Sequence, residues 1–297
     1  MMQPKVKDFL AHRERAGRAL KAQKSSAPQK SPTSRTIGDI YDDSARLASI
    51  RDARPRFMNL GYWEPDTGST TEAQVALMAK LVEGILERSA RATEPKQQKV
   101  LDVACGLGAT TQYLSRRWPA SAIHGINISE DQLEVCRRVA PGCTFVRMDA
   151  ARLEFPDESF DHIVSVEAAF HFKTRKDFLS EARRVLKPGG VLALTDMLIV
   201  PESYEFFPKF ATTVPRENDL GSIEEYEQSI RGSGFSRCDL RDITEEGWRR
   251  FFSFYTAHLH KEWAAGRLRY AALQQMLEFM YLMECTINKM VLCFALK

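Results

Sequence analysis

The sequence lacks any apolar run close to the 18 residues that a membrane-spanning helix needs. Its first residues also lack the apolar core of a secretory signal peptide. A basic, serine-containing leader is typical of organellar transit peptides, but Asp8, Glu14 and the Pro/Ser/Lys stretch that follows favour a solvated tail. We therefore expect a cytoplasmic protein without stable membrane insertion.

Cysteine pairs and metal-ligand clusters are missing as well. The six cysteines are scattered, with no C-x-x-C pair and no Cys/His group at zinc-ligand spacing. This argues against both a disulfide scaffold and a structural zinc site, and we assign no metal.

The chain as a whole has little excess of either charge. With 42 basic and 39 acidic side chains the formal net charge is +3, too balanced for a dedicated nucleic-acid binder. Residues 1–35 hold nine Lys and Arg against two acids, and residues 21–36 have almost no apolar side chains to bury. We expect a basic, flexible segment over 1–36, a helical cap or lid over 37–97 and a core domain over 98–297.

From about residue 98, short apolar runs alternate with amphipathic segments, the pattern of βαβ units in an α/β fold. A helix that buries Phe178, Val185 and Leu186 is expected to stop at Lys187-Pro188-Gly189-Gly190, because proline cannot continue it. The predicted strands are 100–104, 123–126, 144–148, 160–166, 191–195, 238–243 and 290–295.

The last two predicted strands are separated by a helical insertion over about 244–288. It holds more aromatic and methionine side chains than two helices need for docking, among them Trp248, Phe252, Met276 and Phe279. One interpretation is ordinary core or a dimer face, which leaves a homo-oligomer open. The other is that part of the insertion lines an apolar acceptor pocket.

The most informative motif is KVLDVACGLGATTQYL at 99–114. An apolar strand delivers Asp102, and the turn Gly106-Leu107-Gly108 then lets backbone amides approach a ligand closely. A dinucleotide-binding loop uses a similar turn. That alternative is weakened because Thr111 replaces its third glycine and because the next strand ends in Asn127, where a nicotinamide enzyme usually presents an acid.

Several motifs in order resemble those of class I S-adenosylmethionine-dependent methyltransferases, from about residue 41 to the C-terminus. They are VLDVACGLGATT, GINISEDQ, FVRMDAARLEFPDESFDHIVSVEA, FLSEARRVLKPGGVLALTD and, upstream of the core, NLGYW at 59–63. The resemblance implies a Rossmann-like, doubly wound sheet of seven strands, parallel with an antiparallel last strand. A helical N-terminal segment and the helical insertion before the last strand complete the expected fold.

The resemblance also implies S-adenosyl-L-methionine as the cofactor. The residues it assigns to the cofactor are Ala104, Gly106 and Gly108 at the methionine end, Asp102 at its ammonium, Asn127, Ile128 and Gln132 at the ribose, Asp149 and Ala150 at the adenine, and Tyr41, Asn59, Gly61, Tyr62 and Glu167. At the ribose position this chain has Asn127 where many members of the family have Asp or Glu. Its bond to the ribose would therefore not be charge-assisted. Structural alternatives are a helix cap for Asn127, a turn residue for Asp149 and core packing for Tyr62 and Trp63.

A candidate base follows the fourth predicted strand, in Glu167-Ala168-Ala169-Phe170-His171-Phe172. Parallel α/β sheets bind ligands at this edge, and in the methyltransferases that the chain resembles a histidine in this loop can act as general base. Two flanking phenylalanines favour a neutral imidazole. We hypothesise that His171 takes the acceptor's proton and that Glu167 either orients His171 or contacts the cofactor. The alternative is a histidine that only hydrogen-bonds in a packed loop.

The predicted function is methyl transfer to a hydroxyl of a small, moderately apolar natural product. One alternative is carbon methylation of an isoprenoid, sterol or quinone-type acceptor, in which Glu167 would matter more than His171. Another is a protein that binds S-adenosylmethionine without transferring a methyl, as a cyclase-like catalyst or a scaffold. Nitrogen methylation is less favoured, and nucleic-acid methylation rests on the basic segment alone. We therefore expect a small-molecule partner and no nucleic acid.

Overall fold

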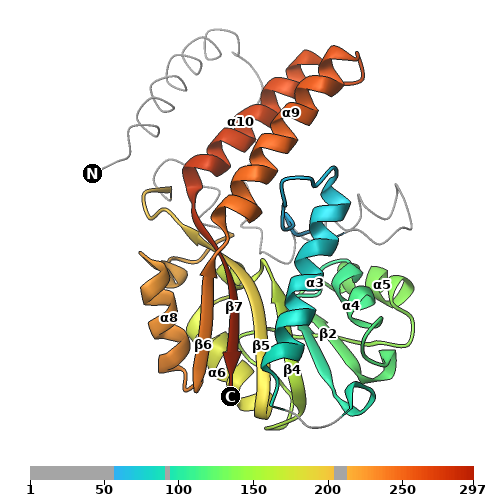
Figure 1. The fold of residues 1–297 in the computed structure, drawn as a ribbon, viewed down its shortest axis with the longest axis vertical. Coiled ribbons are helices and arrows are strands. Elements are labelled where there is room, and N and C mark those ends of the chain that lie inside the picture. Colours follow the sequence, from blue (N-terminus) through green and yellow to red (C-terminus); the bar gives the residue numbers. More distant parts are fainter. Residues whose placement is uncertain (1–56, 91–93, 204–212) are drawn as a thin grey trace, which may run out of the picture.

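The computed structural model describes residues 57–90, 94–203 and 213–297. Seven strands form one sheet in the order β3-β2-β1-β4-β5-β7-β6 (Figure 1). Strands β1 to β5 pair in parallel, and β7 is antiparallel to both of its neighbours, β5 and β6. The bounds are β1 Val100–Val103, β2 Ile123–Asn127, β3 Thr144–Arg147, β4 Phe160–Val166, β5 Leu186–Ile199, β6 Arg237–Asp242 and β7 Ile287–Leu296. The predicted doubly wound sheet with an antiparallel last strand is confirmed.

The strand order reverses between β1 and β4. The chain runs outward from β1 through β2 to β3, and then returns to place β4 on the other side of β1. In an open parallel sheet the loops after these two central strands diverge to opposite faces, which leaves a crevice at their carboxyl ends. This topology places the glycine turn after β1 beside the loop after β4.

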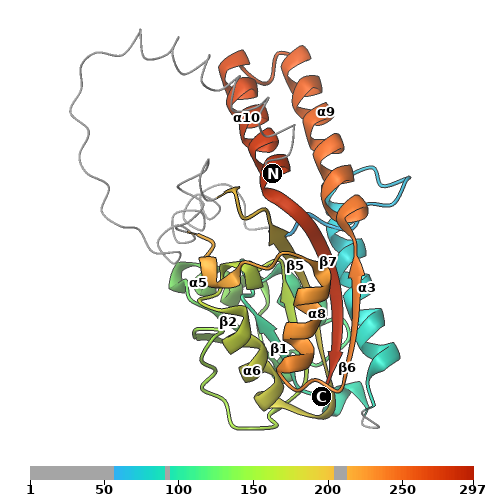
Figure 2. The ribbon, with the colours of Figure 1, turned by 90° about the vertical axis from the view of Figure 1, so that its left-hand side faces the viewer.

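Helices cover both faces of the sheet. On one face lie α3 (Thr70–Arg88), α4 (Ala109–Leu114) and α5 (Glu130–Val139), and on the other α6 (Arg175–Val185) and α8 (Ile223–Gly232) (Figures 1 and 2). Leu77 and Leu81 of α3 pack in one buried cluster, and Phe178 and Tyr226 pack in a second across the sheet. Short helical turns are η1 Pro95–Gln97, η2 Ala120–Ala122, η3 Ala169–His171 and η5 Arg216–Asn218.

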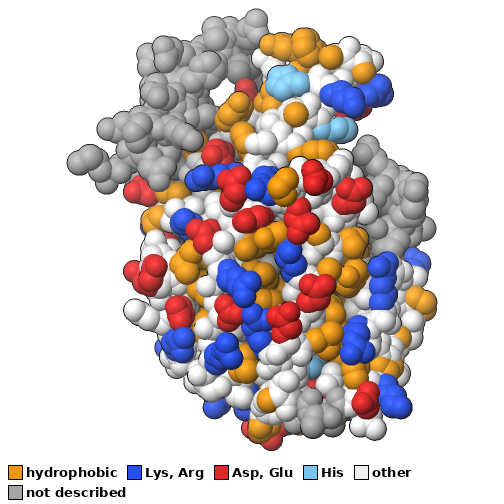
Figure 3. All heavy atoms as spheres, viewed as in Figure 1, with side chains coloured by type: hydrophobic (Ala, Val, Ile, Leu, Met, Phe, Trp, Pro, Cys, Tyr) orange, Lys and Arg blue, Asp and Glu red, His pale blue; other side chains and the backbone are white. Residues whose placement is uncertain are grey.

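The insertion before β7 is helical, as predicted. A π-helical turn, η6 (Glu245–Arg249), leads into α9 (Arg250–Ala264), and α10 (Tyr270–Thr286) returns to the sheet. The α9/α10 hairpin projects beyond the carboxyl edge of the central strands (Figure 2). The hairpin exposes Trp263 and Tyr270 near its outer end and Phe279 and Tyr281 nearer the sheet. Hydrophobic side chains are visible at its outer end in Figure 3.

Strand β5 is longer than the predicted 191–195. Helix α6 ends at Val185, and Leu186 already pairs with Phe160 of β4. Pairing is then irregular across Lys187-Pro188-Gly189-Gly190 and resumes between His162 and Val191. The Pro-Gly-Gly stretch therefore interrupts a strand here, whereas the sequence predicted only a helix stop. None of the described helices is both long and apolar enough to cross a membrane.

Candidate active site

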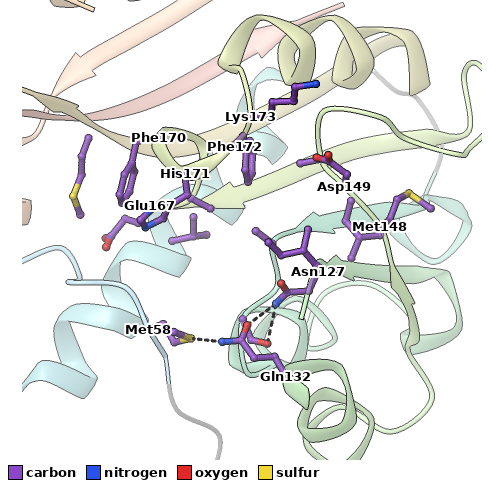
Figure 4. Close-up of a pocket in the computed structure, with 18 of the residues that line it drawn as sticks. Met58, Asn127, Gln132, Met148, Asp149, Glu167, Phe170, His171, Phe172 and Lys173 are labelled. Carbon is purple, nitrogen blue, oxygen red and sulfur yellow. Dashed lines mark hydrogen bonds between the residues drawn. The ribbon is translucent and has the colours of Figure 1, made fainter. Parts of the chain in front are cut away.

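A cavity of about 420 Å³ opens at the carboxyl ends of β1, β2 and β4. Nine of the predicted site residues line it: Ala104, Gly106, Asn127, Ile128, Gln132, Asp149, Ala150, Glu167 and His171. Figure 4 shows Asn127 and Gln132 on one side of this cavity and Glu167, Phe170 and His171 on the other. The structure thus brings together most of the predicted cofactor residues and both candidate catalytic residues.

The glycine turn after β1 needs its glycines for two separate reasons. Ala104, Gly106 and Gly108 all have positive φ, at 58°, 54° and 85°, and glycine adopts this conformation without strain. A Cβ on Gly106 would lie 3.1 Å from Met58 Sδ, and one on Gly108 would lie 3.0 Å from Cys136 Cα. The turn therefore brings bare backbone to the cavity while its outer side packs tightly on α5.

Asp102 lies beneath this turn and is not among the described residues that line the cavity. It is 1% exposed, and Thr111 Oγ1 donates to its Oδ2 at 2.6 Å. Burial raises the pKa of Asp102 to about 7, and the bond from Thr111 lowers it only in part. Asp102 can thus change its charge near neutral pH.

Asn127 and Gln132 form a small polar wall. Asn127 Nδ2 donates to Gln132 Oε1 at 2.6 Å (Figure 4). Ser129 N donates to Asn127 Oδ1 at 3.3 Å. Ser129 also caps α5 by accepting from Gln132 N at 3.1 Å. The cap is therefore Ser129, and the amide of Asn127 orients the Gln132 side chain at the cavity.

The predicted N-terminal site residues are divided between two places. Asn59 lines a second cavity of about 30 Å³ together with Ala104 and Gly106. Gly61, at φ 90°, and Tyr62 dock on α3: Tyr62 N donates to Ala73 O at 2.8 Å, and the Lys80 ammonium lies 4.3 Å from the centre of the Tyr62 ring. Tyr41 lies outside the described residues.

Glu167 joins the end of β4 to the N-terminal segment. Its backbone has φ 50°, and its two carboxylate oxygens accept from Leu60 N at 3.0 and 2.9 Å. Burial raises the pKa of Glu167 to about 8, although the bond from Leu60 acts in the opposite direction. The carboxyl group of Glu167 therefore holds the chain at Leu60 against the cavity wall.

His171 is held by one backbone carbonyl. Its Nδ1 lies 2.5 Å from Thr213 O, and because a carbonyl oxygen can only accept, Nδ1 carries the proton and Nε2 carries the lone pair. Burial lowers the pKa of His171 below its ordinary 6.5. The imidazole is therefore neutral at pH 7, in the tautomer whose Nε2 can accept a proton.

The cavity also contains residues that sequence reasoning missed. Met58 and Leu60 reach it from the N-terminal segment, Met197 from the end of β5, and Pro215 from the loop before η5. Leu60 belongs to the NLGYW segment at 59–63 and Met58 directly precedes it, so these two had a sequence signal. Within the described residues, no three His, Cys, Asp or Glu side chains are grouped so that they could hold a metal ion.

Residues 101–194 match the family model described as "Methyltransferase domain". Methyltransferase GfsG of Streptomyces halstedii is 30% identical over 222 residues, 72% of this chain and 77% of that protein. O-methyltransferase cnsE of Penicillium expansum is also 30% identical, over 72% of this chain and 77% of that protein.

Among solved structures, the [4+2]-cyclase SpnF shares the fold with a TM-score of 0.63 at 24% identity, covering 92% of this chain and 99% of that one. The glycine turn, the polar wall and the order of the strands agree with the sequence match. The chain belongs to the S-adenosylmethionine-dependent methyltransferases, of the natural-product type.

Proposed function

We propose that this enzyme methylates a hydroxyl group of a small, moderately apolar natural product, with His171 as the general base. The observation that carries the proposal is the bond from His171 Nδ1 to Thr213 O. It fixes the tautomer whose Nε2 accepts a proton, at a wall of the same cavity that contains the glycine turn. The name of cnsE as an O-methyltransferase supports oxygen as the acceptor atom.

The residues present fit the cofactor. Asn59 Oδ1 is buried and accepts no hydrogen bond within the described structure, and it lies beside the small cavity lined by Ala104 and Gly106. A buried carbonyl oxygen of this kind suits the ammonium at the methionine end. We assign that end to Asn59, Ala104 and Gly106, the ribose to Asn127 and Gln132, and the adenine to Asp149 and Ala150.

When bound, S-adenosylmethionine would supply an electrophilic methyl group on its sulfonium, and S-adenosylhomocysteine would leave as that methyl passes to the acceptor oxygen. His171 Nε2 accepts the hydroxyl proton of the acceptor as that oxygen attacks, so the acceptor never has to carry a free alkoxide. Leu60, Phe170 and Met197 supply an apolar wall that orients an apolar acceptor and excludes water. Holding both reactants in one cavity accounts for much of the catalysis in such a displacement.

The acceptor is found by incubating the protein with methyl-labelled S-adenosylmethionine and a metabolite extract of its source. Mass spectrometry then identifies labelled products, and their fragments show which atom is methylated. A label on oxygen supports the proposal, whereas a label on carbon or nitrogen would overturn its acceptor class. If no product is labelled although cofactor binding is confirmed in the same sample, the proposal that the enzyme methylates a hydroxyl in that extract is overturned. The alternative that the protein binds the cofactor without transferring a methyl is then favoured.

The role of His171 is tested with His171→Gln on the acceptor identified in this way. General-base catalysis predicts that kcat falls by about 10²- to 10⁴-fold, while the Kd for S-adenosylhomocysteine is unchanged. His258→Gln on exposed α9 is the matched control and should keep wild-type kcat. Because burial lowers the pKa of His171, wild-type kcat should fall only below pH 6.5. Full turnover by His171→Gln would contradict the assignment.

A further inference from the structure

Behind the His171 loop lies an ion pair that the proposed chemistry does not use. Asp196, on β5, is 0% exposed, and Arg175, the first residue of α6, is 3% exposed. Arg175 Nε donates to Asp196 Oδ2 at 2.7 Å, and Tyr226 OH of α8 donates to the same oxygen at 2.8 Å. Two helices on one face of the sheet, α6 and α8, therefore converge on a single carboxylate of β5.

The pair holds the backbone on both sides of His171. Asp196 Oδ1 accepts from Phe170 N at 3.0 Å. Asn218 Nδ2 donates to Phe172 O at 2.6 Å, and Asn218 Oδ1 in turn accepts from Arg175 N at 2.6 Å. The residues immediately before and after the imidazole are thus both anchored to the buried network.

The same network reaches two further parts of the cavity wall. Arg175 Nη2 donates to Met197 O at 2.6 Å, and Arg175 Nη1 donates to Asn218 O. Asn218 is the last residue of η5, the turn that follows Thr213 and Pro215. Arg175 therefore links the loop that carries the base to the segment whose carbonyl fixes the tautomer of that base.

Burial of this ion pair is by itself weak evidence that the pair stabilises the fold. Taking two charges out of water costs several kcal/mol per ion, and well-packed apolar residues often replace a buried pair without loss of stability. What apolar residues cannot supply is the set of directed bonds that defines one geometry for the His171 loop.

We propose that Arg175 and Asp196, with Tyr226 and Asn218, are positioning residues that hold His171 at the cavity wall and against the Thr213 carbonyl. The inference rests on the proposed role of His171 as the base. A misplacement of about 1 Å at a catalytic group can cost about 10²-fold in rate. The network therefore acts through His171, and it does not touch the acceptor.

The central variant is Asp196→Asn, which keeps an oxygen for Phe170 N but removes the charge that pairs with Arg175. Its matched control is Asp161→Asn, at the amino end of β4. Asp161 is likewise buried, at 1% exposed, and accepts from a cation (Lys187 Nζ, 2.7 Å) and from a backbone amide (Lys99 N, 2.8 Å). Tyr226→Phe is a milder variant that removes one bond to Asp196, and it carries the test if Asp196→Asn does not fold.

Two readouts separate positioning from general structural damage. Asp196→Asn should lower kcat by about 10²-fold, with the Kd for S-adenosylhomocysteine unchanged, whereas Asp161→Asn should keep kcat. In a His171→Gln background, Asp196→Asn should cause no further loss, because residues that act as a unit are not additive. The proposal would be overturned if Asp196→Asn lowered kcat no more than Asp161→Asn does. It would also be overturned if Asp196→Asn lowered kcat as much in the His171→Gln background as it does in the wild type.

A third readout needs no acceptor. In protein labelled with ¹⁵N-histidine and saturated with S-adenosylhomocysteine, the His171 signal, assigned with His171→Gln, should show the Nδ1–H tautomer. Asp196→Asn or Tyr226→Phe should shift it toward the other tautomer or toward exchange between the two, and an unchanged signal in both variants would contradict positioning. If His171→Gln keeps full turnover while this shift is observed, the proposed base fails and the positioning of the imidazole stands.

Discussion

At the scale of single residues, the site contains two buried acids whose protonation is set by desolvation. Burial raises the pKa of Asp102 to about 7 and that of Glu167 to about 8. Both groups therefore change protonation state close to neutral pH. A ligand that carries a positive charge near either group favours its ionised form.

This gives a prediction for the pH dependence of cofactor binding. Because the pKa of folded Asp102 lies above its ordinary 3.8, its contribution to folding is fully present below about pH 4 and is lost as the pH rises through 7. The ammonium of S-adenosylhomocysteine offsets that loss when bound nearby. We therefore expect saturating S-adenosylhomocysteine to raise the Tm more at pH 8 than at pH 6, as measured by calorimetry.

Asp102→Asn is the control for this prediction, since it removes the titrating group and keeps its size. The Tm increase caused by S-adenosylhomocysteine should then differ less between pH 6 and pH 8. A pH dependence unchanged in Asp102→Asn would assign the effect to Glu167 or to another group.

At the scale of elements, α3 packs against β7 at a glycine. Gly84 of α3 faces Phe294 of β7, and a Cβ on Gly84 would lie 2.1 Å from Phe294 Cζ. The Arg88 guanidinium covers the same ring at 4.5 Å from its centre. The helix therefore approaches the sheet over a residue without a side chain.

Gly84→Ala should consequently destabilise the protein, although alanine is the better helix former. Helix propensity alone would stabilise by about 1 kcal/mol, but overpacking of this kind costs about 1–3 kcal/mol. Gly232→Ala in α8 is the matched control, because nothing lies within 4 Å of its added Cβ, and it should be neutral or stabilising. Urea unfolding of the two variants measures the difference, and equal stabilities would contradict the close contact.

At the scale of the whole molecule, residues 60–63 join the cavity to the α9/α10 hairpin. Leu60 is bound by Glu167 at the cavity. Three residues later, Trp63 N donates to Glu246 O at 2.8 Å, and Arg250 Nη1 donates to Trp63 O at 2.8 Å. The Trp63 ring also packs against Phe254 of α9, with the ring centres 4.5 Å apart. The hairpin is thus anchored to the same short segment that lines the site.

Trp63→Ala should therefore loosen the base of the hairpin as well as the segment itself. Trp63 is 2% exposed, and removing a buried aromatic ring costs about 3–5 kcal/mol. Trp263→Ala, at the outer end of the hairpin and 43% exposed, should cost much less. Hydrogen exchange should show faster exchange in α9 for Trp63→Ala only, and protection equal to wild type would contradict the anchoring.

The sequence by itself determined the strands, the glycine turn and the helical insertion, because each leaves a local pattern. An apolar run of four to seven residues, a G-x-G after Asp102 and a dense aromatic stretch are readable within short windows. The motif order also located nine of the residues that line the cavity, including Asn127, Gln132 and Asp149. The lengths of β5 and β7 differed most, because these two strands pair with each other as far as Ile199 and Ile287, and because Leu186 already pairs with Phe160 of the neighbouring β4.

Only the tertiary structure decided how the site is held together. Glu167 binds Leu60, 107 residues earlier, and His171 binds Thr213, 42 residues later. The Arg175–Asp196 pair likewise joins α6 to β5. Such contacts depend on which elements the sheet topology brings side by side, and periodicity within a segment carries no information about the partner of a side chain in another segment.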